Sequence, residues 1–296
     1  MNGLFKDACP VVNVPFHEDE GIDYAGIDRM VDFVIESGCK SVCLFAFNSE
    51  PHKMTLEEKK SVIRYFLKSV NGRLQTVIGL IDNSIKGVME LGLTAKEANA
   101  DGIILYPPSV SCPAGEELIY YFQTIAAAVD LPTMIQDNPR STGINMSLEF
   151  ILEIYGRVPQ FRYLKVECPF PTRKIRRIHE LTDGDIKCYS GNGGIYTIDA
   201  YNCGAWGIMP GVAACRKFAE IYECLQAGEE AQARDLFEKI LPLVWYEDQS
   251  LEFYIACEKE LLKEMQVIDN AVVRRPGTVL SQAEKKELFC LYNRLK

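Results

Sequence analysis

Eight short apolar segments alternate along this chain with eight longer amphipathic ones, and this alternation most limits the folds available to it. The apolar segments are predicted strands, at residues 10–14, 41–47, 75–80, 102–106, 133–136, 163–166, 186–189 and 205–209. The amphipathic segments are predicted helices, at residues 24–37, 56–70, 85–98, 115–129, 147–155, 171–181, 194–203 and 213–227. Strands that alternate with helices form parallel sheets, and eight such units close into a barrel. The predicted fold is therefore α/β, a (β/α)8 TIM barrel.

An open doubly wound sheet is the rival arrangement for the same alternation. Its dinucleotide-binding form carries a GxGxxG motif after the first strand, and this chain has none there. Several predicted strands are apolar almost throughout, which is typical of parallel strands covered on both faces. We therefore favour the closed barrel.

The chain continues beyond the eighth unit with further helical patterns at residues 229–243, 249–265 and 282–294. No low-complexity linker precedes them. We predict a barrel over residues 1–228 and a C-terminal helical extension over residues 229–296, packed together as a single structural unit.

The charge balance limits the partners of the chain. A net charge of −9, from 32 basic and 41 acidic residues, argues against nucleic acid, because phosphate binding depends on concentrated Lys and Arg. The one basic cluster, Arg173 to Arg177, is interpreted as the solvated face of a helix. No apolar run approaches the roughly 18 residues of a membrane span, and the N-terminal segment lacks the pattern of a signal peptide. We expect a cytoplasmic protein with no membrane partner.

Metal ligands are not indicated by the sequence either. None of the 11 cysteines lies in a CxxC pair, and the three histidines are scattered at positions 17, 52 and 179. The thiols are expected to be buried and reduced.

Lys165 is the first candidate for chemistry, because it lies within an apolar strand, Tyr163 to Val166. Burial disfavours the ammonium form and lowers its pKa, which leaves a nucleophilic amine for a carbonyl substrate. The alternative is a lysine that reaches past the strand end into solvent.

Three loops at predicted strand ends are further candidates, since the chemistry of such barrels is found there. They are Ala46 to Glu50 after the second strand, Gln136 to Gly143 after the fifth, and Ser190 to Gly194 after the seventh. Their polar side chains and backbone N–H groups could bind a carboxylate. Each could also be an ordinary turn without a ligand, because turns favour the same residue types.

Taken in order, these segments resemble the N-acetylneuraminate lyase and dihydrodipicolinate synthase family of Schiff-base barrels, over essentially the whole chain. The GTTGE loop of that family corresponds to residues 46–50, and its strand-six lysine to Lys165. Its glycine-rich strand-seven loop corresponds to Gly191 and Asn192, and its GxxGxIS motif is similar to residues 204–209.

The resemblance implies a small 2-oxo acid as substrate, bound covalently through Lys165, with no cofactor and no metal. It also implies a homotetramer. The substrate-binding residues that we assign on this basis are Ala46, Phe47, Asn48, Ser49, Asp137, Gly191, Asn192 and Met209.

Departures from the family pattern indicate that the activity differs from those of dihydrodipicolinate synthase and N-acetylneuraminate lyase. The strand-five tyrosine that shuttles protons in the family falls on Gln136, which cannot act as an acid or base near neutral pH. The tyrosine after the strand-four Pro-Pro is Ser109. The chain is more similar to the L-2-keto-3-deoxyarabonate dehydratase branch, whose strand-five motif also reads Gln-Asp-x-Pro and whose Lys-Ile-Glu resembles residues 165–167.

The resulting hypothesis is a lyase that removes water from a 2-keto-3-deoxy sugar acid. Lys165 would form the imine, Gln136 would orient a hydroxyl or water, and Glu167, on the same strand face as Lys165, is a candidate base. Glu167 could instead be a structural partner that neutralises Lys165, and Asp137 is a second candidate base. The rival functions are a retro-aldol lyase that releases pyruvate and a non-catalytic 2-oxo-acid sensor.

Overall fold

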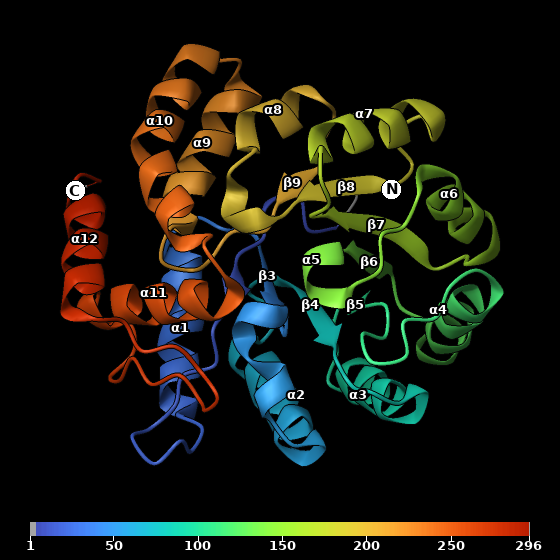
Figure 1. The fold of residues 1–296 in the computed structure, drawn as a ribbon, viewed down its shortest axis with the longest axis horizontal. Coiled ribbons are helices and arrows are strands. Elements are labelled where there is room, and N and C mark those ends of the chain that lie inside the picture. Colours follow the sequence, from blue (N-terminus) through green and yellow to red (C-terminus); the bar gives the residue numbers. More distant parts are fainter. Residues whose placement is uncertain (1–3, 296) are drawn as a thin grey trace.

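The computed structural model describes residues 4–295 and confirms a (β/α)8 barrel with a helical C-terminal part (Figure 1). Its strands are β1 (Asp7–Ala8), β2 (Val11–Val12), β3 (Ser41–Leu44), β4 (Gln75–Leu80), β5 (Gly102–Leu105), β6 (Thr133–Asp137), β7 (Phe161–Val166), β8 (Lys187–Ser190) and β9 (Gly207–Ile208). All neighbouring strands pair in parallel, in the order β1-β9-β8-β7-β6-β5-β4-β3-β2.

The first predicted strand is two short pieces in the structure. β1 pairs with β9 and β2 pairs with β3, so the two pieces together close the barrel. Cys9 and Pro10 separate them. Pro10 has no N–H group to donate to a ladder, which explains why pairing is interrupted here.

The helices surround the strands in Figure 1. Their bounds are α1 (Tyr24–Glu36), α2 (Leu56–Val70), α3 (Ile85–Glu97), α4 (Glu116–Val129), α5 (Pro139–Thr142), α6 (Leu148–Arg157), α7 (Pro171–Leu181), α8 (Thr197–Asn202), α9 (Cys215–Ala227), α10 (Glu230–Glu247), α11 (Leu251–Glu264) and α12 (Gln282–Asn293). Three 3-10 turns join them, η1 (Phe47–Ser49), η2 (Pro51–Lys53) and η3 (Asn192–Gly194).

Local sequence explains several of these helix starts. Side-chain oxygens accept hydrogen bonds from backbone N–H groups of the first turn at Asp23, Thr55, Ser84, Asn138, Ser147, Ser250 and Ser281. The helix predicted over 194–203 is shorter, because Gly193 and Gly194 have φ values of 62° and 93°, which end η3 before α8 begins.

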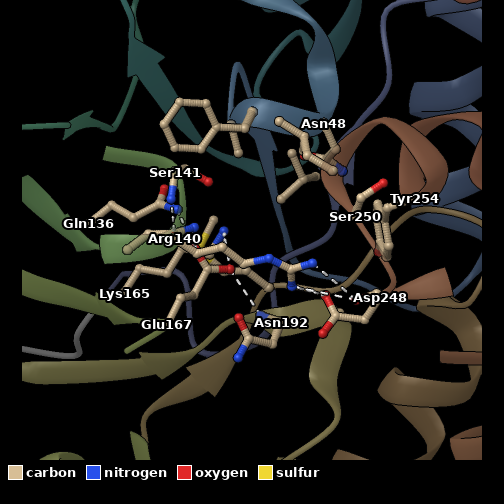
Figure 2. Close-up of a pocket in the computed structure, with 17 residues that line it drawn as sticks. Asn48, Gln136, Arg140, Ser141, Lys165, Glu167, Asn192, Asp248, Ser250 and Tyr254 are labelled. Atoms are coloured by element: carbon tan, nitrogen blue, oxygen red, sulfur yellow. Dashed lines mark hydrogen bonds and ion pairs between the residues drawn. The ribbon is translucent and has the colours of Figure 1, made fainter. Parts of the chain in front are cut away.

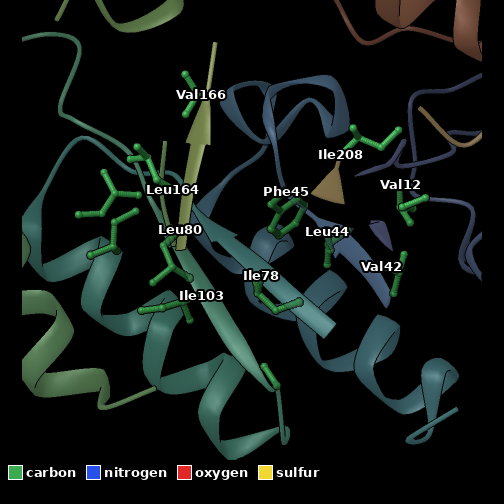
Figure 3. Packing of buried hydrophobic residues seen from close by; sticks show 14 of the residues in the cluster. Val12, Val42, Leu44, Phe45, Ile78, Leu80, Ile103, Leu164, Val166 and Ile208 are labelled. Carbon is green, nitrogen blue, oxygen red and sulfur yellow. The ribbon is translucent and has the colours of Figure 1, made fainter. Parts of the chain in front are cut away.

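Two buried layers of side chains follow from the alternation along each strand. One layer faces the helices, and Figure 3 shows its members from successive strands, including Val42, Ile78, Ile103, Leu164 and Ile208. The other layer fills the barrel interior, with Val11, Cys43, Val77, Ile104, Met134, Tyr163, Tyr189 and Met209.

The N-terminal segment lies across the end of the barrel interior, at the N-terminal ends of the strands. The ring of Phe5 packs against Tyr163, with centroids 5.3 Å apart. The Tyr189 hydroxyl donates to the Phe5 carbonyl, and the Trp206 indole N–H donates to the Leu4 carbonyl at 3.0 Å. Contacts between residues far apart in the sequence therefore close this end of the barrel.

Helices α10, α11 and α12 follow the barrel and lie on one side of the molecule, with α10 alongside α9 (Figure 1). Gly228, in the left-handed conformation, ends α9 before α10 begins. The predicted ranges 1–228 and 229–296 include residues 1–3 and 296, which lie outside the described residues. None of the described helices is long and apolar enough to cross a membrane.

A buried ion cluster joins the C-terminal helices to the barrel. Glu50, between η1 and η2, and Lys259, on α11, are both fully buried and form an ion pair. The Glu50 carboxylate also pairs with Lys53 at 3.1 Å and accepts a hydrogen bond from the Arg274 backbone N–H at 3.0 Å. The Lys259 ammonium lies 4.2 Å from the centroid of the Phe16 ring. This cluster fixes the segment that follows β3, which forms part of the site described next.

Candidate active site

A pocket opens at the C-terminal ends of the barrel strands, where parallel-barrel enzymes carry their active sites (Figure 2). Its residues come from strand ends, from the loops after β3, β6, β7 and β8, and from the junction of α10 with α11. They are Val11, Ala46, Phe47, Asn48, Gln136, Asn138, Arg140, Ser141, Lys165, Glu167, Asn192, Gly193, Met209, Asp248, Ser250, Leu251 and Tyr254.

Lys165 reaches the pocket from β7. Its strand neighbours Leu164 and Val166 belong to the layer that faces the helices, so Lys165 points into the barrel. The side chain is 6% exposed, and its Nζ lies 3.3 Å from Oε1 of Glu167. A lysine in this position is enclosed by the pocket and does not extend into solvent.

Glu167, two residues after Lys165, is held by hydrogen bonds on both oxygens. Oε1 accepts from the Asn192 backbone N–H at 2.9 Å, and Oε2 accepts from Asn138 Nδ2 at 2.8 Å and from Gln136 Nε2. Gly191 makes room for this carboxylate, because a Cβ there would lie 2.1 Å from Oε1. The carboxylate is therefore fixed beside the lysine amine.

Gln136 has one amide atom without a partner. Because its Nε2 donates to the Glu167 carboxylate, its Oε1 is directed elsewhere. That oxygen is buried and accepts no hydrogen bond from any residue between 4 and 295. A buried unpaired acceptor in a pocket is suited to a hydroxyl or water of a bound molecule.

Arg140 crosses the outer part of the pocket (Figure 2). Its guanidinium donates to the Gln249 carbonyl at 2.8 Å and pairs with Asp248 at 3.4 Å. This bridge joins the loop after β6 to the junction of α10 and α11. No local motif in the sequence indicates Asp248, Ser250 or Tyr254 as pocket residues, because they come from ordinary helical patterns.

Eight of the predicted site residues line this pocket: Ala46, Phe47, Asn48, Gln136, Lys165, Glu167, Asn192 and Met209. Gly191 lies beside it, where it leaves space for Glu167. Within residues 4–295, no group of three or more His, Cys, Asp or Glu side chains could hold a metal ion.

Two assigned substrate-binding residues point away from the pocket. Asp137 follows Gln136 on β6, so its side chain faces the helices, where it pairs with Lys174 at 2.6 Å. The Ser49 hydroxyl donates to the Val12 carbonyl and accepts from the Phe45 backbone N–H, which stabilises the η1 turn. Both side chains serve the framework of the site, which corrects their assignment as ligands of the substrate.

Two fully buried carboxyl groups, Glu247 and Glu258, lie on the helices that provide the Tyr254 wall of the pocket. Each has one oxygen without a hydrogen-bond partner among the described residues, and Glu258 also accepts from the Ala213 backbone N–H at 3.2 Å. Burial raises the pKa of Glu258 to about 7. Burial and the charge of Glu258 raise the pKa of Glu247 well above its usual range.

We expect the folded state to lose stability as the pH rises from about 4.5 to about 7. Over this interval an unfolded Glu258 releases its proton while the folded one retains it, so unfolding becomes more favourable. Above about 7 the contribution of Glu258 levels off. Glu258→Gln should therefore stabilise the protein at pH 8 by about 3 kcal/mol and change it much less at pH 5. Thermal unfolding at both pH values measures this, and an equal effect at both would contradict it.

The sequence is similar to those of known proteins. The model of the dihydrodipicolinate synthetase family matches residues 4–293. A 4-hydroxy-tetrahydrodipicolinate synthase of Alkaliphilus oremlandii is 26% identical over 291 residues, 97% of each chain. An L-2-keto-3-deoxyarabonate dehydratase of Azospirillum brasilense is 27% identical over 290 residues, 97% of this chain and 93% of the relative.

The fold agrees with solved structures as well. The dihydrodipicolinate synthase of Rhodopseudomonas palustris superimposes with a TM-score of 0.91 and 26% identity, over 98% of this chain and 97% of that one.

Proposed function

The chain belongs to the dihydrodipicolinate synthetase family, whose members are lyases, and we propose that it is a Schiff-base-forming dehydratase of 2-keto-3-deoxy sugar acids. The observation that carries this proposal is the enclosed pair of Lys165 and Glu167, with Nζ and Oε1 3.3 Å apart. The amine provides a nucleophile for a carbonyl group, and the carboxylate provides a proton acceptor next to it.

In the proposed reaction, the Lys165 amine adds to the C2 carbonyl of the substrate, and loss of water forms an iminium. The iminium acidifies the C3–H bond, and Glu167 takes that proton to leave an enamine. The enamine then expels the C4 hydroxyl, which leaves as water after it receives the proton held by Glu167. From a 2-keto-3-deoxypentonate, tautomerisation and hydrolysis of the imine would release 2-oxoglutarate semialdehyde and return the lysine.

The neighbouring residues suit the binding of such a substrate. Asn48 lies in η1, whose first backbone N–H groups, those of Phe47 and Asn48, have no carbonyl partner within the turn and could bind the substrate carboxylate. The unpaired Oε1 of Gln136 would accept a hydrogen bond from a substrate hydroxyl or from water.

Dehydration fits the pocket better than retro-aldol cleavage. Cleavage requires a base for the C4 hydroxyl, a role that the family assigns to the tyrosine at the position of Gln136. Glu167 is held instead close to the Lys165 nitrogen, and therefore close to the C3 proton of a bound imine. The similarity to a 2-keto-3-deoxyarabonate dehydratase over 97% of the chain supports the same choice.

Imine trapping tests the proposal. The protein would be incubated with pyruvate or with 2-keto-3-deoxy-L-arabonate, reduced with borohydride and weighed intact, alongside Lys165→Ala and Lys165→Arg. We expect an adduct on the unaltered protein only, on the peptide that contains Lys165, and semialdehyde in the unreduced reaction. Lys165→Arg retains a positive charge beside Glu167, so a missing adduct on it reflects the lost amine.

The other outcomes separate the rival functions. Pyruvate released from the sugar acid would assign retro-aldol cleavage. No adduct with either compound would exclude the imine for these substrates and favour a binding protein for 2-oxo acids. Catalysis without a cofactor, assembly as a homotetramer and a cytoplasmic location stay predictions.

A further inference from the structure

A second hollow lies at the opposite end of the barrel from the active-site pocket. Its walls include Gln75 and Thr76 at the start of β4, Lys40 just before β3, and Asp101 just before β5, so it adjoins the N-terminal ends of the strands. The groove has a volume of about 780 Å³. This lies within the roughly 300–1,000 Å³ that pockets for small ligands and cofactors occupy.

The groove is strongly basic in a chain whose net charge is −9. Five cationic side chains line it: Lys6, Lys40, Arg64, Lys68 and Arg73. The lining contains one carboxylate, that of Asp101, which is occupied by the backbone N–H of Thr76 at 2.8 Å and by its hydroxyl at 3.1 Å. The groove therefore carries a net positive charge, although the chain as a whole is negatively charged.

Three of these cations form no direct ion pair. Arg73 pairs with Asp32 at 2.7 Å, and the Lys6 ammonium lies 5.5 Å from the ring of Trp206. The side chains of Lys40, Arg64 and Lys68 form no ion pair or hydrogen bond with any other residue of the described chain.

Several basic residues elsewhere on the surface are paired. In the basic cluster of α7, Arg177 pairs with Glu180 at 2.6 Å. Asp7 is next to Lys6 in the sequence, and its carboxylate accepts a hydrogen bond from Gln226 and interacts with the charges of Lys6 and Lys40. Like charges that share a groove repel one another unless an anion lies between them.

The remaining lining suits a ligand that is only partly charged. Leu67, Val70, Leu74 and Ala98 provide apolar surface, and Asn71 and Asn99 lie beside them. A long polyanion such as nucleic acid would be repelled by the rest of a chain of this net charge, whereas a small anion meets only the local field.

We propose that this groove binds a small metabolite that carries two or more phosphate groups, with the phosphates on Lys40, Arg64 and Lys68. A nucleoside polyphosphate has this chemistry and adds a flat ring for the apolar residues. The groove shares no lining residue with the active-site pocket, so this proposal does not rest on the proposed reaction.

Calorimetric titration with ATP, tripolyphosphate and adenosine tests the proposal, in magnesium-free buffer at low and at high salt. ATP and tripolyphosphate should bind, adenosine should not, and affinity should fall as salt screens the charges. Arg64→Glu with Lys68→Glu should weaken binding by about tenfold or more, because both cations become anions. The matched control is Lys86→Glu with Lys286→Glu, the same charge change at exposed positions outside the groove.

Several outcomes would overturn the proposal. They are the absence of binding heat at millimolar ATP, an equal loss in the control variant, or displacement of ATP by pyruvate, which would assign binding to the other pocket. Tighter binding of ATP than of tripolyphosphate would indicate that the apolar residues contact the adenine ring. Thermal unfolding of both double variants shows that each is folded.

Discussion

Replacing Glu167 with Gln should lower kcat for dehydration of the 2-keto-3-deoxy sugar acid by about 10²- to 10⁴-fold, the usual contribution of a positioned acid or base. The change preserves size and removes the ability to carry a proton. Lys165 is unchanged, so a pyruvate adduct should still form after borohydride treatment. Steady-state rates of semialdehyde release measure the effect.

Asp248→Asn provides the comparison, because Asp248 is the other carboxylate in the wall of the pocket and is paired with Arg140. We expect its kcat to change by less than about tenfold. If Asp248→Asn abolishes turnover while Glu167→Gln retains it, the base has been assigned to the wrong carboxylate. The kcat of Glu167→Gln should also lose the pH dependence on the acid side that a carboxylate base imposes.

Lys259→Met should destabilise the fold by about 3–5 kcal/mol, since it leaves the buried carboxylate of Glu50 with fewer counter-charges. Burial lowers the pKa of Lys259 to about 8, against the opposing charge of Glu50. Its ammonium also donates to the Val272 carbonyl at 2.7 Å, so the change removes a hydrogen bond as well. Thermal unfolding at fixed protein concentration measures the loss.

A double change distinguishes the ion pair from simple loss of packing. Glu50→Gln combined with Lys259→Met should recover part of the lost stability, because no uncompensated charge stays buried. Arg177→Met removes an exposed pair with Glu180 and should cost less than about 1 kcal/mol. Equal losses for Arg177→Met and Lys259→Met would contradict the importance of burial.

Hydrophobic periodicity was enough to predict most of the barrel. The segments 56–70, 75–80 and 171–181 have the predicted bounds, because their apolar spacing repeats without interruption. The first strand differs because Pro10 interrupts its pairing, and the short α5 within the polar loop after β6 has no apolar repeat that could indicate it.

Part of the site could be predicted from the geometry of the barrel. Strand ends of a parallel barrel meet at one edge, so Gln136 and Lys165 could be placed together, and the structure pairs them in register. The same alternation places Asp137 on the opposite face. Asp248 and Tyr254 could not be predicted, because their position depends on how α10 and α11 pack against the barrel, which no local pattern encodes.

The N-terminal segment that closes the end of the barrel affects the order in which the molecule can assemble. Leu4 and Trp206 are separated by 202 positions, and β1 finds its partner only in β9. Leu4 and β1 must therefore wait for their partners until the segment that contains β9 has been synthesised. Contacts this distant in sequence form slowly, because a long loop must close before they stabilise anything. Before β1 pairs with it, β9 has one unpaired edge, and such an edge can pair with strands of other chains.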